Sequence, residues 1–168
     1  PDGILGIVNG GQAAVEALCD HPGISALAFV GSTRVAKLVY GRACATGKRA
    51  LCLGGAKNHL IVVPDADLEL TADNVTASFT GCAGQRCMAA SVLVAVGDVD
   101  HIIDAVAERA ASINTGVQMG PINSASSVTR INKYIDGAEA SGAKLLVDGR
   151  GTNPVDGGYW MGPTLIDG

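Results

Sequence analysis

The sequence predicts an α/β fold, in which helices pack against a mainly parallel sheet and parts of two such domains are present. Strand-like and helix-like segments alternate along the first part of the chain, a pattern typical of parallel α/β layers. The run from Ile24 to Val30 is almost continuously apolar, which indicates a strand that is buried on both faces. Paired glycines at Gly10-Gly11 and Gly54-Gly55 follow strand-like segments and predict sharp turns.

Composition limits the class of protein. The chain has 168 residues, of which 48% are hydrophobic and 17% charged, so it is not a disordered tail. Its net charge of −4 is spread without blocks of like sign, which argues against nucleic acid as a partner. No apolar run reaches the roughly 20 residues that a membrane crossing needs. Five unevenly spaced cysteines favour a reducing, cytoplasmic setting over a disulfide framework.

Residues 1–50 contain a regular alternation of elements after a short extended segment from Ile4 to Val8. Helix-like patterns cover residues 12–19 and 34–45, and strand-like patterns cover residues 24–30 and 49–53. Glycine and proline end the helices, in His21-Pro22-Gly23 and at Gly47. This order indicates a parallel layer, and we expect the first domain to end at residue 50.

Residues 51–168 form the expected second domain, because the regular alternation of strand-like and helix-like segments changes after the stretch Leu51–Gly55. Asp65 or Asp67 precedes the expected helix over residues 68–80. An aspartate there can cap the helix and interact favourably with the positive N-terminal end of its dipole. Residues 148–158 are rich in Gly, Asn and Pro and are expected to form an exposed loop. The remaining expected elements are strands over 59–63, 91–96 and 144–147 and helices over 68–80, 99–112 and 125–141.

The first motif with chemical potential is Phe29-Val30-Gly31-Ser32-Thr33. A buried strand leads directly into a helix start with small, hydroxylic side chains. Free N–H groups and the helix dipole attract phosphate at such a position, and a hydroxyl adds a hydrogen bond. The structural alternative is that Ser32 or Thr33 only caps the helix.

The second motif, Leu51-Cys52-Leu53-Gly54-Gly55, places two glycines at the carboxyl end of a strand. Ligands of α/β proteins usually bind at this edge of the sheet. Leu53 could offer an apolar face to a flat ring there. The simpler interpretation is a strand end followed by a turn, with Lys57 and His59 as ordinary surface side chains.

The third motif lies between Thr80 and Ser91 and contains Cys82, Arg86 and Cys87 among small residues. A free thiol has a pKa near 8.5, so a nucleophilic cysteine needs a cation, a helix N-terminus or a base nearby. Arg86 is adjacent to Cys87, although it could instead bind a substrate anion. Zinc is disfavoured because no second cysteine pair or histidine cluster is present. The alternative is a helix end with a buried cysteine.

Taken together, the three motifs resemble the aldehyde dehydrogenase superfamily in their order and separation, over the whole chain. Pro64–Asp67, Met119–Pro121 and Gly162–Thr164 fit the same pattern. Gly54–His59 and Gly84–Ala89 look most like the CoA-acylating methylmalonate-semialdehyde dehydrogenase family. The resemblance implies that residues 1–50 end a Rossmann-like NAD-binding domain and that residues 51–168 begin the catalytic domain.

The resemblance also implies a role for each motif. Cys87 would attack an aldehyde to form a thiohemiacetal, hydride would pass to NAD, and a thioester would remain on the enzyme. The Cys87 N–H would donate to the oxyanion. Arg86 would bind the substrate carboxylate. The cofactor-binding residues would be Gly31, Ser32, Leu53 and Gly54, with Ser32 at the pyrophosphate and Leu53 near the nicotinamide, and no metal is expected.

Two positions depart from the common pattern of the superfamily. Cys52 occupies the place where hydrolytic members carry the glutamate that activates water, so coenzyme A becomes the expected acyl acceptor. Ala36 stands where a second glycine is frequent. We also expect the chain to be an inactive fragment of a longer protein, because the resemblance places an oxyanion asparagine before Pro1 and a ribose-binding glutamate after Gly168.

These observations support three hypotheses. The first is a CoA-acylating, NAD-dependent (methyl)malonate-semialdehyde dehydrogenase that forms a homo-oligomer in its full-length state. The second is a general NAD(P)-dependent aldehyde dehydrogenase that releases a free acid. The third is a non-catalytic α/β binding module. The sequence does not distinguish NAD from NADP or define the exact aldehyde.

Overall fold

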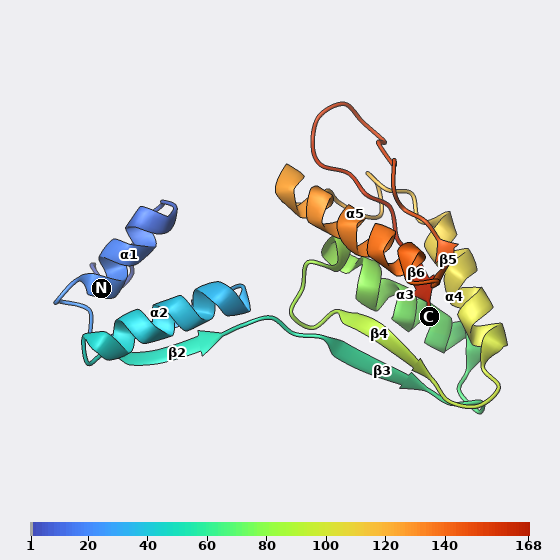
Figure 1. Cartoon of the computed structure of the whole chain (residues 1–168), viewed down its shortest axis with the longest axis horizontal. Coiled ribbons are helices and arrows are strands. Elements are labelled where there is room, and N and C mark those ends of the chain that lie inside the picture. Colours follow the sequence, from blue (N-terminus) through green and yellow to red (C-terminus); the bar gives the residue numbers. More distant parts are fainter. Residues whose placement is uncertain (1) are drawn as a thin grey trace. The chain divides into compact units, whose positions relative to one another are not determined.

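The computed structural model describes residues 2–168 and divides into two compact units, residues 1–56 and 57–168 (Figure 1). The expected boundary after residue 50 would divide the strand Arg49–Leu53 between the two domains. In the structure this strand pairs with Ala26–Val30 and lies within the first unit. The assignment of the two units to a cofactor domain and a catalytic domain remains a prediction.

The first unit consists of two parallel strands and two helices. The strands are β1 (Ala26–Val30) and β2 (Arg49–Leu53), paired from Ala26 with Arg49 to Val30 with Leu53. The helices are α1 (Gln12–Asp20) and α2 (Thr33–Ala45). In Figure 1, α2 lies along β2. The strand, helix and strand that the sequence predicts for this region are therefore present, in the predicted parallel arrangement.

Only one face of this small sheet is covered. The side chains of β1 alternate between half-buried and exposed, with Leu27 and Phe29 half-buried and Val30 70% exposed. The prediction of a strand buried on both faces is wrong for the described residues, because α2 covers a single face. The extended segment at Ile4–Val8 is also not a strand, since its residues have no ladder partner among the described ones and are exposed.

An ion pair joins the two helices of the first unit. The Arg42 guanidinium donates two hydrogen bonds of 2.7 Å to the carboxylate of Asp20. These hydrogen bonds lower the pKa of Asp20 from its usual value. Lys48 also donates to the carbonyl groups of Cys19 and His21 at the end of α1, where cations satisfy unpaired helix carbonyls.

The second unit contains a parallel strand pair, an antiparallel strand pair and three long helices. Asn58–Val62 (β3) pairs in parallel with Ala90–Ala95 (β4), and Lys144–Val147 (β5) pairs antiparallel with Leu165–Asp167 (β6). The helical elements are α3 (Leu68–Thr80), the short 3₁₀ turn η1 (Gly81–Gly84), α4 (Asp100–Ser112) and α5 (Ala125–Ala140). The predicted loop at residues 148–158 is confirmed as lacking a helix or strand.

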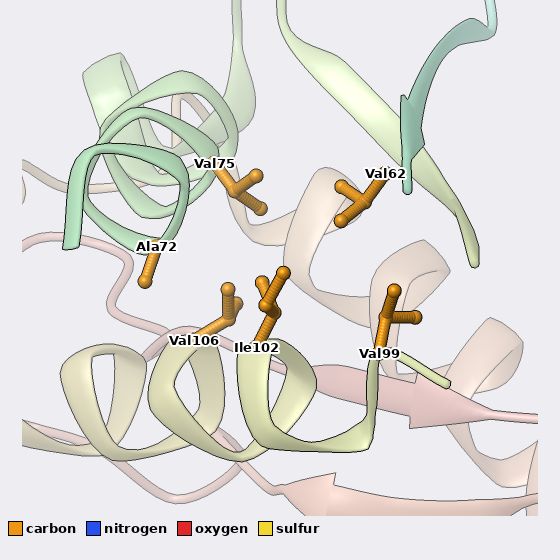
Figure 2. Packing of buried hydrophobic residues seen from close by; sticks show 6 residues of the cluster. All are labelled: Val62, Ala72, Val75, Val99, Ile102 and Val106. Atoms are coloured by element: carbon orange, nitrogen blue, oxygen red, sulfur yellow. The ribbon is translucent and has the colours of Figure 1, made fainter. Parts of the chain in front are cut away.

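The core of the second unit lies between α3, α4 and β3 (Figure 2). Its central side chains are 5% exposed or less and come from Val62, Ala72, Val75, Val99, Ile102 and Val106. Asp67 caps α3 by accepting a 2.8 Å hydrogen bond from the Leu70 N–H, which confirms the predicted cap. A second apolar cluster joins Ile122, Ile135 and Met161 under α5. None of the helices in the part of the chain described has the length and apolar character that crossing a membrane requires.

Candidate active site

Two of the predicted ligand-binding motifs meet at the carboxyl ends of β1 and β2. The Gly31 N–H donates a 3.1 Å hydrogen bond to the Leu53 carbonyl, so the two residues lie side by side. Helix α2 begins two residues after Gly31, and the chain turns away from the sheet at Gly54 and Gly55. The sequence-predicted cofactor residues of this unit are therefore brought together at one edge.

Ser32 is the N-cap of α2. Its hydroxyl accepts a 3.4 Å hydrogen bond from the Val35 N–H, and the residue is exposed. The capping alternative is thus realised by Ser32, whereas Thr33 is the first residue of the helix. The N–H groups of Thr33 and Arg34 donate to no acceptor among residues 2–168. Free donors at a helix start are suited to bind a phosphate.

Thr33, which the sequence suggests only as a possible helix cap, contributes a side-chain contact to this edge. Its hydroxyl accepts a 3.0 Å hydrogen bond from the Gly55 N–H and so ties the glycine turn to α2. A Cβ atom on Gly54 would lie 2.9 Å from this hydroxyl and 3.1 Å from the Thr33 Cα. Close approach of the two backbones explains why a residue without a side chain occupies position 54.

Cys52 lies on the covered face of β2. It is half-buried, whereas its neighbours Leu51 and Leu53 are exposed. The phenol of Tyr40 on α2 has a raised pKa, mainly because of its hydrogen bond with Cys44, then because of the charge of Cys44 and burial, and least because of the nearby Cys52. Position 52 therefore carries a thiol beside α2 and no carboxylate.

In the second unit, Cys87 sits in a tight turn. The Ala89 N–H donates a 3.2 Å hydrogen bond to the Arg86 carbonyl, which makes Cys87 and Met88 the central residues of a β-turn. Cys87 is exposed and unpaired with another cysteine, so the alternative of a buried cysteine is wrong. The Cys87 N–H donates to no acceptor in the described part of the chain and is free to serve a ligand.

The residues before this turn have an unusual backbone. Cys82 and Ala83 have φ values of 51° and 52°, and Gly84 continues in the left-handed region with φ of 70°. For L-residues this region costs about 1–2 kcal/mol each. Gln85 holds the segment in place, because its amide nitrogen donates to the carbonyls of Cys82 at 3.0 Å and Pro121 at 3.1 Å.

Gln85 also accepts a 2.9 Å hydrogen bond from the Asn123 N–H through its side-chain oxygen. It thus joins the strained segment to residues 121–123. Gln85 lies within the motif Gly84–Ala89, but no local signal in the sequence points to partners that lie almost forty positions along the chain. The strain is localised in the few residues that precede the exposed thiol, as is common at functional sites.

Arg86 contacts the end of α3. Its Nη2 donates to the carbonyls of Ala77 at 3.1 Å and Ser78 at 3.2 Å, where a cation complements the helix dipole. The guanidinium covers Gly81, and a Cβ atom at that position would collide with it. Nη1 and Nε have no acceptor among residues 2–168, and the expected contact with a substrate carboxylate remains a prediction.

Asn58 fixes the other side of the turn. Its side-chain nitrogen donates to the carbonyls of Cys87 at 2.7 Å and Ala89 at 3.0 Å.

A separate cavity of 650 Å³ lies in this unit between α3, β4, α5 and residues 161–168, and Cys87 is not among the residues that line it. The candidate thiol is therefore presented on the surface of the turn.

The second unit thus presents an exposed free thiol on a clamped turn, and the first unit presents a helix start with unused N–H donors. The chain belongs to the aldehyde dehydrogenase family, whose profile matches residues 1–168. Several semialdehyde dehydrogenases are similar to it. Malonate-semialdehyde dehydrogenase 3 of Geobacillus kaustophilus is 45% identical over 99% of this chain and 36% of its own length.

Two further relatives extend the comparison. A protein of Drosophila pseudoobscura pseudoobscura with the name "Probable methylmalonate-semialdehyde/malonate-semialdehyde dehydrogenase [acylating], mitochondrial" is 40% identical, over 99% of this chain and 34% of that protein. A crystal structure with the name "putative methylmalonate-semialdehyde dehydrogenase", from Sinorhizobium meliloti 1021 and in complex with NAD, matches this chain with a TM-score of 0.88 and 42% identity. The match covers 95% of this chain and 34% of that one. This chain spans about a third of the length of these relatives.

Proposed function

We propose that a full-length protein carrying this segment is an NAD-dependent aldehyde dehydrogenase that converts malonate or methylmalonate semialdehyde into an acyl-CoA. The observation that carries the proposal is the exposed Cys87 thiol, in a turn whose Cys87 N–H is unused. The names of the similar proteins support this substrate class. Because this chain spans about a third of the length of those proteins, residues outside it would complete the site.

Cys87 would perform the covalent chemistry. Its thiolate attacks the aldehyde carbon, the carbonyl double bond opens, and the oxygen becomes an alkoxide to which the Cys87 N–H can donate. Loss of hydride from this thiohemiacetal leaves a thioester on Cys87. The thiolate of coenzyme A then attacks the thioester, which releases the acyl-CoA and returns Cys87 as a thiolate.

The edge formed by β1, β2 and α2 would bind NAD, which supplies the hydride acceptor when bound. Ser32 and the free N–H groups of α2 suit a pyrophosphate. Gly31, Leu53 and Gly54 would line the approach to the nicotinamide. The NAD that is bound in the Sinorhizobium meliloti relative favours NAD over NADP.

Cys52 is the reason to propose coenzyme A as the acceptor. A half-buried thiol at this position does not replace a carboxylate as the base that activates water. Hydrolysis of the thioester should therefore be slow, and a thiol co-substrate becomes the productive acceptor. The word "acylating" in the name of the Drosophila relative agrees with this.

We also propose a cytoplasmic homo-oligomer. All five cysteines are free, which suits a reducing compartment. The expectation of an oligomer rests on the family resemblance, and light scattering on the full-length protein tests it.

The decisive experiment compares Cys87→Ser with Cys44→Ser in the full-length protein, because Cys44 is also an exposed free cysteine. NADH formation from malonate semialdehyde should fall by at least about 10³-fold in Cys87→Ser and stay unchanged in Cys44→Ser. Mass spectrometry should find an acyl-CoA as the product. Free acid, formed at a rate that coenzyme A does not change, would favour a general aldehyde dehydrogenase. A wild-type protein without turnover would favour a non-catalytic module, and the isolated 168-residue chain should form no NADH.

A further inference from the structure

Asn58 stands where the parallel ladder between β3 and β4 is interrupted. It pairs with Ala90, but the next residue, His59, pairs with Val92. The shift leaves Ser91 without a partner in the ladder, as in a β-bulge. Regular main-chain pairing therefore stops at the residues that lead from the Cys87 turn into β4. A side chain has to link the turn to β3 instead.

The Asn58 amide makes this connection with both of its N–H donors. They bond to the carbonyl oxygens of Cys87 at 2.7 Å and Ala89 at 3.0 Å, which lie on either side of Met88. Because both partners are acceptors, the nitrogen and not the oxygen of the amide must face them. The two bonds use the full donor capacity of the side chain.

No other group among residues 2–168 donates to the Cys87 carbonyl. Met88 is 81% exposed and does not pack against the unit. The segment before the turn is held by Gln85 in a left-handed backbone that costs energy. Without Asn58, the turn would keep the hydrogen bond from Ala89 to Arg86. Arg86 would also stay bound to the end of α3, and the Ala90 N–H would still donate to the Ser78 hydroxyl at 3.0 Å.

We propose that Asn58 is a positioning residue for Cys87, an inference that rests on the proposed catalytic role of this thiol. By fixing the Cys87 and Ala89 carbonyls, the Asn58 amide holds the turn in the conformation that directs the Cys87 thiol and N–H to the same aldehyde group. The chemical requirement is a neutral side chain with two donors.

Hydrogen exchange on this chain tests the clamp itself. Asn58→Ala removes both donors, and the isosteric Asn58→Asp sets a carboxylate oxygen against two carbonyl oxygens. Amide exchange in residues 86–90 should become about tenfold faster in Asn58→Ala, as expected for the loss of two hydrogen bonds, and faster still in Asn58→Asp. Residues of α3 and α4 should keep their protection, which verifies that the variants fold.

The matched controls are Asn74→Ala and Asn74→Asp. The Asn74 amide also donates to a carbonyl, that of Leu70 at 2.9 Å within α3, and it lies on the exposed side of that helix. These variants should leave exchange in residues 86–90 unchanged. Unchanged exchange in the Asn58 variants would overturn the clamp.

Kinetics in the full-length protein test the positioning role. The Asn58 variants should lower kcat about 10- to 100-fold, the effect of a small displacement of a reacting group, with KM for the aldehyde and NAD within about twofold. Faster exchange without a loss of kcat, or a rise in KM that accounts for the loss, would overturn the role. If Cys87→Ser keeps turnover, the proposed function fails, and the exchange experiment still decides on the clamp.

Discussion

The two loops that carry the candidate chemistry are built in different ways. At the end of β1 and β2, main-chain atoms and a close approach of Gly54 to Thr33 define the geometry. Around Cys87, side-chain amides from Asn58 and Gln85 restrain a turn that follows a left-handed segment. The conformation of the first loop depends on small residues that let two backbone segments approach closely. The conformation of the second loop depends on side-chain hydrogen bonds, some of them from residues distant in the sequence. The two loops should therefore respond to different substitutions.

The largest effect on the first loop is expected from Gly54→Ala. The added Cβ would lie 3.1 Å from the Thr33 Cα, so the turn has to move away from α2. We expect a loss of about 1–3 kcal/mol in the free energy of unfolding, as for overpacked sites, and a higher KM for NAD in the full-length protein. Urea unfolding followed by circular dichroism measures the first effect.

Gly41→Ala provides the control within α2. A Cβ at this exposed position meets no atom within 4 Å. Alanine should stabilise the helix by about 0.5–1 kcal/mol. If Gly54→Ala is equally well tolerated, the close approach at Thr33 does not determine the first loop.

A smaller effect of opposite sign is expected in the second loop from Ala83→Gly. Ala83 has a φ of 52°, a conformation that glycine adopts without steric cost. Glycine should stabilise the second unit by up to about 1 kcal/mol, and thermal unfolding followed by the fluorescence of Trp160 can measure it.

Ala77→Gly, at an exposed position in α3, is the matched control. Here glycine should destabilise the helix by about 1 kcal/mol. Destabilisation by glycine at both positions would show that residue 83 does not adopt the left-handed conformation in solution.

These contrasts also explain what the sequence could predict. The β1–α2–β2 order, the Asp67 cap and the position of the glycine turn depend on neighbouring residues, and the sequence reveals such local relations. The single covered face of β1 was missed because an apolar strand does not indicate which faces have partners. The tie between Thr33 and Gly55, and the amides of Asn58 and Gln85, join positions 22 to 38 residues apart. One sequence contains no signal for such pairs.

The smallest predicted effect concerns acid stability in the first unit. Hydrogen bonds from Arg42 hold the pKa of Asp20 below its usual 3.8. A carboxyl with a lowered pKa in the folded state stabilises the fold above its unfolded pKa, and this contribution is lost as the pH falls through the folded pKa.

Asp20→Asn should therefore be slightly less stable than the wild type at pH 6, and the difference should be lost as the pH falls from 3.8 through the lowered pKa of the folded state. Unfolding in urea across this pH range provides the measurement. Because the pair is exposed, salt should reduce the difference. A difference that is independent of pH would mean that Asp20 acts through packing instead of charge.

The uncovered face of β1 and β2 has a consequence for the behaviour of this chain in solution. Val30, Leu51 and Leu53 are each more than half exposed on this face. A contiguous apolar surface of this kind associates with other copies of the chain. The 168-residue chain should therefore aggregate more readily as its concentration rises.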